Sequence, residues 1–205
     1  SSTDVYNVAV GMNAGANITT GVRNTLIGGL AGDALTTGNY NVALGYTALG
    51  GEDAGSANTA IGYAALAVQD AGDAYNTAVG FEAGKSVTTG VQNTIMGGLA
   101  GDALTTGEQN TAIGYAALSG ETAGDRSVAI GTYALFAQNN TSNVDVYNIA
   151  IGYQAGTNVT TGSQNTIIGG LAGDALTSGA NNVAVGYLAL STEDTNGHNV
   201  AIGRK

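Results

Sequence analysis

The amino-acid sequence predicts an all-β fold, a parallel β-solenoid or β-roll of about twelve coils with about 17 residues in each coil. Three observations support this prediction. A unit that reads N-x-A-I-G-Y-x-A-L recurs along the whole chain of 205 residues. The 34 glycines oppose a helical repeat, because glycine is a poor helix former. Within each unit, β-branched residues alternate with small ones, which is the period-two pattern of a strand.

The first position of the unit is asparagine in every coil except one, where Ser127 replaces it. The spacing between first positions is 17 residues, with one step of 18 and one of 21. We expect the asparagines to stack into a ladder, with their amides bonding from coil to coil and to the backbone of the turns. The ladder comprises Asn7, Asn24, Asn41, Asn58, Asn76, Asn93, Asn110, Asn148, Asn165, Asn182 and Asn199.

The fourth position of the unit is large and apolar in all twelve coils, and we expect it to form the core. The third position is mostly alanine and the fifth is always glycine, so these small residues would lie on the opposite face of each strand. A further glycine near position 15 predicts a turn with positive φ. The predicted core consists of Val10, Ile27, Leu44, Ile61, Val79, Met96, Ile113, Ile130, Ile151, Ile168, Val185 and Ile202.

A longer period lies above the 17-residue repeat. Every fourth coil carries the segment G-G-L-A-G-D-A-L-T, starting at Gly28, Gly97 and Gly169. We therefore interpret residues 1–205 as one continuous domain of three four-coil blocks, 6–74, 75–146 and 147–205. Where the third position of a coil is large, its sixth position is glycine instead of an aromatic residue, as expected where two positions share limited space.

Charge and composition exclude several classes of partner. The chain has 15 acidic and 5 basic residues, a net charge of −10, which opposes binding to nucleic acid and to anionic membranes. No segment has the ~20 apolar residues that would span a bilayer, so we expect no membrane insertion. With no cysteine and His198 as the one histidine, few pairs of nucleophile and base can form, and we predict that the protein is not an enzyme.

A second copy of the chain is the partner that the repeat pattern favours. A thin coil of valine, isoleucine and alanine buries little surface per residue, and small solenoids are marginally stable alone. The face of glycine and alanine allows another subunit to approach closely. We therefore expect a parallel homotrimer, and the unpaired coils at both ends could also join copies end to end.

The repeated units Asn58-Thr59-Ala60-Ile61-Gly62-Tyr63 and Asn148-Ile149-Ala150-Ile151-Gly152-Tyr153 resemble the head repeats of trimeric autotransporter adhesins of the YadA-like type. They are also similar to repeats in bacteriophage tail fibres, which the T-T-G turns match better. The resemblance implies a left-handed, trimeric β-roll in an extracellular location, on a virion appendage or a bacterial surface.

Three functions are compatible with these features. The leading hypothesis is a structural or adhesive fibre segment, such as a phage tail fibre that spaces or presents a receptor-binding tip. The head of a bacterial surface adhesin that binds host matrix is the first alternative. A secreted, self-assembling extracellular filament is the second.

Calcium is the one cofactor that the sequence suggests. The segment G-G-L-A-G-D-A-L resembles the nonapeptide of calcium-binding β-rolls, and its acidic residues are Asp33, Asp102 and Asp174. Since the segment occurs once in four coils, adjacent coils cannot share an ion, and we predict no cofactor. The acidic pairs Glu52–Asp53 and Glu193–Asp194 are interpreted as a solvated acidic edge, and the recurring threonine pairs as hydrogen-bonded turns.

One insertion interrupts the repeat between Ser127 and Asn148. It predicts a longer polar loop at residues 136–145, which also holds an N-x-T glycan-acceptor pattern. A loop that protrudes from a regular rod is the most favourable contact point for a cell-surface receptor or a glycan. The residues named for this contact are Gln138, Asn139, Asn140, Thr141 and Asn143.

Overall fold

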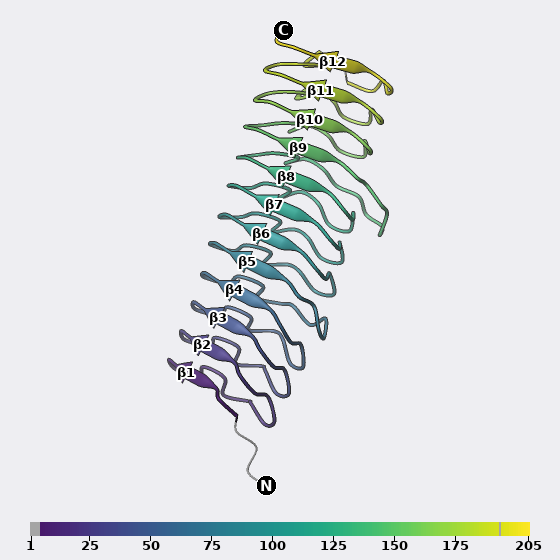
Figure 1. The fold of residues 1–205 in the computed structure, drawn as a ribbon. Helices are drawn as coiled ribbons and strands as arrows, with labels where there is room; N and C mark the ends of the chain where they lie inside the picture. Colours follow the sequence, from purple (N-terminus) through teal and green to yellow (C-terminus); the bar gives the residue numbers. More distant parts are fainter. Residues whose placement is uncertain (1–4, 193) are drawn as a thin grey trace.

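The computed structural model describes residues 5–192 and 194–205 and forms one elongated solenoid (Figure 1). Each coil contributes one strand of three residues. The strands are β1 (Val8–Val10), β2 (Thr25–Ile27), β3 (Val42–Leu44), β4 (Thr59–Ile61), β5 (Thr77–Val79), β6 (Thr94–Met96), β7 (Thr111–Ile113), β8 (Val128–Ile130), β9 (Ile149–Ile151), β10 (Thr166–Ile168), β11 (Val183–Val185) and β12 (Val200–Ile202).

The strands form one parallel sheet in chain order, β1 to β12. Equivalent positions of neighbouring coils pair in register, as where Thr59 of β4 lies beside Thr77 of β5. The predicted solenoid, its coil length and its strand positions are therefore confirmed. The strands are only three residues long because the fifth position, a glycine such as Gly62 with φ of +134°, turns the chain away from the sheet.

Each coil turns corners at residues with left-handed backbone conformation. Around the fourth coil these are Ala57, Ala64 and Leu66, with φ between 49° and 60°. The prediction that the glycine near position 15 supplies positive φ is wrong for most coils. At Gly38 the reason for glycine is close approach, because a Cβ there would lie 2.1 Å from the carbonyl oxygen of Gly55 in the next coil.

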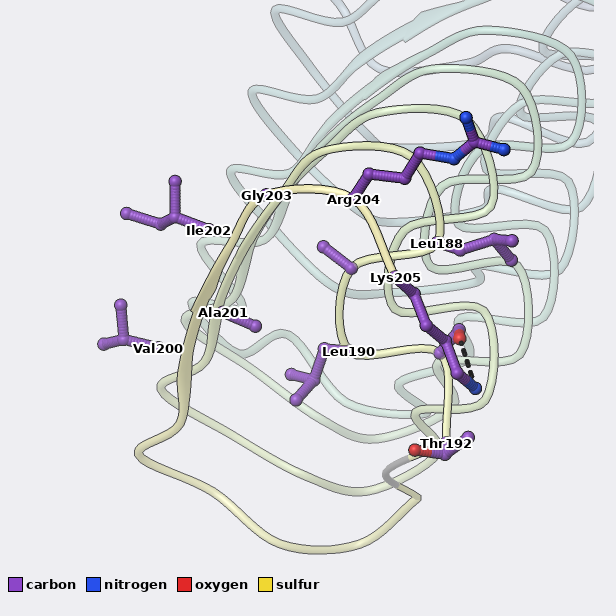
Figure 2. A pocket seen from close by; sticks show the side chains of 11 residues that line it. Leu188, Leu190, Thr192, Val200, Ala201, Ile202, Gly203, Arg204 and Lys205 are labelled. Atoms are coloured by element: carbon purple, nitrogen blue, oxygen red, sulfur yellow. Dashed lines mark hydrogen bonds between the residues drawn. The ribbon is translucent and has the colours of Figure 1, made fainter.

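The predicted core is wrong, because the fourth position of each unit points outward. Val10 is 58% exposed and Ile27 is 37% exposed, and the remaining members of that set are exposed or half-buried. Figure 2 shows the arrangement at the last coil, where Val200 and Ile202 point away from the coil while Ala201 points into it. The small third position therefore faces the interior, and the glycine–alanine face is not available to another subunit.

The true core lies between the third position and the opposite wall of the coil, at positions 9 and 12. The interior is narrow, so a large residue at one of these sites requires a small one at another. A Cβ on Gly32 would lie 2.9 Å from Leu26, and one on Gly84 would lie 2.9 Å from Ile95. The largest fully buried apolar side chains are Leu26, Leu35, Leu49, Leu66, Ile95, Leu104, Leu118, Leu135, Ile167 and Leu176.

The asparagine ladder is present as predicted. The backbone N–H of Asn110 donates to the side-chain oxygen of Asn93 (2.9 Å), and the side-chain amide of Asn93 donates to the carbonyl of Gly107 (3.0 Å). Asn24, Asn41, Asn58, Asn76, Asn93, Asn110, Asn148, Asn165 and Asn182 are buried, while Asn7 and Asn199 in the end coils are half-buried. Most of these asparagines thus tie the start of one coil to its own turn and to the next coil. The side-chain amide of Asn58 is an exception, because it is buried without a hydrogen-bond partner.

Replacing Asn93 with alanine should strongly destabilise the solenoid. The change removes an acceptor from the N–H of Asn110 and a donor from the carbonyl of Gly107, and leaves both groups buried. Two unsatisfied buried groups cost about 2–5 kcal/mol. Thermal unfolding followed by circular dichroism measures the loss, with the exposed Asn17→Ala as control. Equal melting temperatures for the two variants would contradict the role of the ladder.

Within residues 5–192 and 194–205, no helix is long and apolar enough to cross a membrane.

Candidate functional site

The first and third residues of strands β1 to β12 form one continuous outer surface, which we call the strand face. Every side chain on it is valine, threonine, isoleucine, leucine or methionine, and none carries a charge. Neighbouring strands lie ~4.8 Å apart, so twelve strands make a face about 50 Å long. A monomer seldom exposes a continuous apolar surface of this extent, and such surfaces commonly mark sites of protein interaction.

A row of aromatic side chains runs beside the strand face. The rings of Tyr46 and Tyr63 stack with centroids 5.9 Å apart, and those of Tyr63 and Phe81 with centroids 5.3 Å apart. All three side chains are about half exposed. The row is interrupted at Thr132 and at Gly29, Gly98 and Gly170, and at each of these glycines the tyrosine of the next coil lies over the glycine. These rings widen the apolar surface at its edge.

The candidate calcium residues do not come together. Asp33, Asp102 and Asp174 occupy equivalent places four coils apart. Nowhere in the described chain do three histidine, cysteine, aspartate or glutamate residues lie near enough to hold a metal ion. One carboxylate oxygen of Asp102 and one of Asp174 are buried without a hydrogen-bond partner, and nothing in the structure explains them.

The insertion loop folds back onto the two coils before it. The hydroxyl of Thr106 donates to Asn143 (2.7 Å), and that of Thr122 donates to Asn139 (3.1 Å). Thr141 is exposed, as are Asn139 and Asn143, whereas Asn140 is half-buried. The prediction that Gln138 is available to a partner is wrong, because its side chain is fully buried.

Glu121 explains why this loop is held down. Its carboxylate is buried and accepts hydrogen bonds from the backbone N–H groups of Thr122, Ala123, Gly124 and Asn140 and from the side chains of Gln138 and Asn140. Burying a carboxyl group is costly unless hydrogen bonds replace those that it made to water. Two of its six bonds come from Asn140 of the insertion, so the loop stabilises the interior as well as adding surface.

Glu52 is the equivalent residue of the first block, and its interpretation as part of a solvated edge is wrong. Its side chain is fully buried, accepting from the N–H of Gly55 (2.6 Å) and the amide of Gln69 (3.0 Å). Burial, which disfavours the charged form, raises the pKa of the Glu52 carboxyl above its usual value. Asp53 is exposed as predicted, and so is Asp194, whereas Glu193 lies outside the described residues.

Replacing Glu52 with glutamine should make stability less dependent on pH. Folding raises the pKa of the Glu52 carboxyl. The contribution of Glu52 to the free energy of unfolding is therefore fully present below its pKa in the unfolded chain, and it is lost as pH rises through its pKa in the folded chain. The melting temperature of E52Q relative to that of the original chain should therefore rise from pH 4 to pH 7, on top of a pH-independent loss from the oxygen that can no longer accept a hydrogen bond. Thermal unfolding measured between pH 4 and pH 7 tests this prediction, with the exposed Asp53→Asn as control. A difference in melting temperature between E52Q and the original chain that does not change with pH would contradict it.

The threonine pairs form hydrogen-bonded turns, as predicted. The hydroxyl of Thr88 donates to the carbonyl of Thr105 (3.2 Å), and that of Thr105 donates to the carbonyl of Thr122 (2.9 Å). His198 is exposed and takes part in a turn through its backbone N–H, which donates to Ala180.

A hollow of about 500 Å³ lies at the end of the last coils and is lined by Leu188, Leu190, Ala201 and neighbouring residues (Figure 2). Leu190 and Ala201 are interior positions of their coils, so this hollow is the end of the core and not a separate site. A second hollow, of about 420 Å³, lies on the side of the solenoid between coils two and five.

Compared with protein-family models, with curated proteins and with solved structures, the chain has no significant match. The comparisons therefore identify no family, and the likeness to adhesin-head and tail-fibre repeats stays a prediction.

Proposed function

We propose that this chain is a structural segment of an extracellular fibre, assembled as a homotrimer, and that it has no enzymatic activity. The single observation that carries the proposal is the strand face, an uncharged and mostly apolar surface that runs the length of a rod-like solenoid. A surface of this kind is stable in water when another apolar surface covers it.

A second copy of the same chain fits the strand face best. Two copies have strand faces of the same length and the same repeat. In a parallel arrangement, each side chain of one face therefore meets the equivalent side chain of the other. Copies related by a closed symmetry axis cover the face without leaving a surface that would recruit further chains. A threefold arrangement lets three such faces meet around one axis, in keeping with the resemblance to trimeric fibre repeats.

The mechanical consequence is stiffness. Each coil is joined to the next by strand pairing, and most coils are also joined by the asparagine ladder or by the threonine turns. A bundle of three such rods resists bending along its whole length. A stiff, unreactive spacer is what an appendage such as a phage tail fibre needs in order to hold a receptor-binding tip away from its base.

The solution mass tests this proposal. Light scattering coupled to size-exclusion chromatography should give three times the chain mass of 20.1 kDa. The mass should not grow with protein concentration, since growth would indicate an open filament. A mass of one chain at micromolar concentration would overturn the proposal, and a mass of two chains would replace the trimer with a dimer.

A further inference from the structure

None of the residues that line the hollow on the side of the solenoid belongs to a strand, and Tyr63 of the aromatic row contributes to its lining. Its floor is made of small residues in the third and fourth coils, Gly50, Gly51, Ala64 and Ala67. Leu30 and Asp33 close one end, Glu82 and Lys85 close the other, and Tyr63 and Thr47 complete the lining. Its volume of about 420 Å³ lies in the range of small-ligand sites.

The second block shows that the coil does not require this hollow. The equivalents of Ala64 and Ala67 are Tyr133 and Phe136, whose rings pack edge to face with centroids 5.3 Å apart. Tyr133 also packs on Tyr115, with centroids 5.6 Å apart. Aromatic rings thus stand where the first block has alanines and an open floor.

The charges around the hollow restrict what it could hold. Lys85 forms an ion pair with Glu82 (3.1 Å), which neutralises the one cation in the lining. Asp33 places a carboxylate oxygen over the floor, 3.4 Å from where a Cβ on Gly50 would stand. An anionic ligand would meet this carboxylate without a compensating cation, on a chain of net charge −10.

The polar and apolar groups of the lining are complementary to a sugar. Alanine, glycine and leucine surfaces suit the C–H faces of a pyranose ring, while a carboxylate accepts hydrogen bonds from hydroxyl groups. The hydroxyl of Thr47 donates to the carbonyl of Tyr46 (2.8 Å), which leaves its lone pairs able to accept from a ligand. A wholly apolar ligand would bury the Asp33 carboxylate without a partner.

We propose that the hollow between coils two and five is a binding site for a short neutral oligosaccharide, with Asp33 accepting hydrogen bonds from its hydroxyl groups. The site does not depend on the fibre function, since it is built within a single chain.

Nuclear magnetic resonance titration with maltotriose, chitotriose and cellotriose as probes tests the proposal. At least one probe should shift backbone amide signals in coils two to five, with no comparable shifts in coils six to nine. Asp33→Asn should weaken binding by roughly tenfold, which is the effect of losing a charged hydrogen-bond partner. Asp102→Asn is the matched control, because Asp102 holds the same place in the second block, where Tyr133 and Phe136 replace Ala64 and Ala67, and it should leave binding unchanged.

Ala67→Phe supplies a second test, because the second block accommodates phenylalanine at the equivalent position 136. It should abolish binding while the spectrum stays that of a folded chain. Several results would overturn the proposal. These are no shifts with any probe at tens of millimolar, shifts spread evenly along the solenoid, equal effects of the two aspartate variants, or full binding by A67F. Tighter, salt-sensitive binding of spermidine would indicate a cation site instead.

Discussion

Placing an aspartate at Ile113 is expected to convert the proposed trimer into monomers without unfolding the solenoid. Ile113 is the third residue of β7, near the middle of the strand face. Assembly would bury three carboxylates together without partners, and each unpaired buried charge costs several kcal/mol. Association should weaken by about a thousandfold or more. Within one chain the side chain points outward, so the β-sheet circular dichroism should remain.

Val68→Asp is the matched control for this prediction. Val68 is 48% exposed and lies outside the strands, so the same charge is introduced away from the strand face. Light scattering should give the trimer mass for V68D and the mass of one chain for I113D. A trimer of I113D would show that another surface joins the copies. Loss of β structure in I113D would show that Ile113 belongs to the core.

Replacing Gly62 with alanine is the second change with a large expected effect. A Cβ on Gly62 would lie 2.2 Å from the carbonyl oxygen of Gly80 in the next coil, and backbone cannot move away as a flexible side chain can. Its φ of +134° is also a conformation that other residues rarely adopt. We expect a loss of about 4 kcal/mol or more, or a fall in melting temperature of roughly 10 °C.

Gly72→Ala is a comparison variant that lacks the contact between coils. Gly72 has φ of +67°, but no atom lies within 4 Å of the position that a Cβ would take. This variant should therefore lose only the ~1–2 kcal/mol of a left-handed backbone. Thermal unfolding by circular dichroism compares the two. If G62A melts at the same temperature as G72A, contact between coils is not the reason why the fifth position of every coil is glycine.

The fold was predictable because each coil repeats the same hydrogen bonds. The first-position asparagines, such as Asn93, recur at intervals that match one coil, and a side chain that bonds to the next coil must recur at that interval. The strand positions followed from the alternation of small and β-branched residues in the same units. Both features are local in sequence, and so a single chain displays them.

The interior could not be assigned by hydrophobicity alone. Large residues such as Ile113 were expected inside, yet a coil of this size has little room opposite the third position. A useful signal was present at position 12, where Ile18, Leu35 and Val87 alternate with Glu52 and Gln69. Comparing position 12 across the coils would have placed Glu52 and Gln69 in the interior, since the coils on either side of this pair have apolar residues there. The side hollow gave no such signal, because it depends on how neighbouring coils stack.

The central claim is that the third residue of each strand faces other copies of the chain while the second faces its own interior. Cross-linking of single cysteine variants with a bismaleimide tests it directly, because the chain has no native cysteine. Ile113→Cys should give covalently joined chains on a denaturing gel, and Ala112→Cys should give single chains only. Joined chains from A112C, with I113C remaining single, would contradict the account.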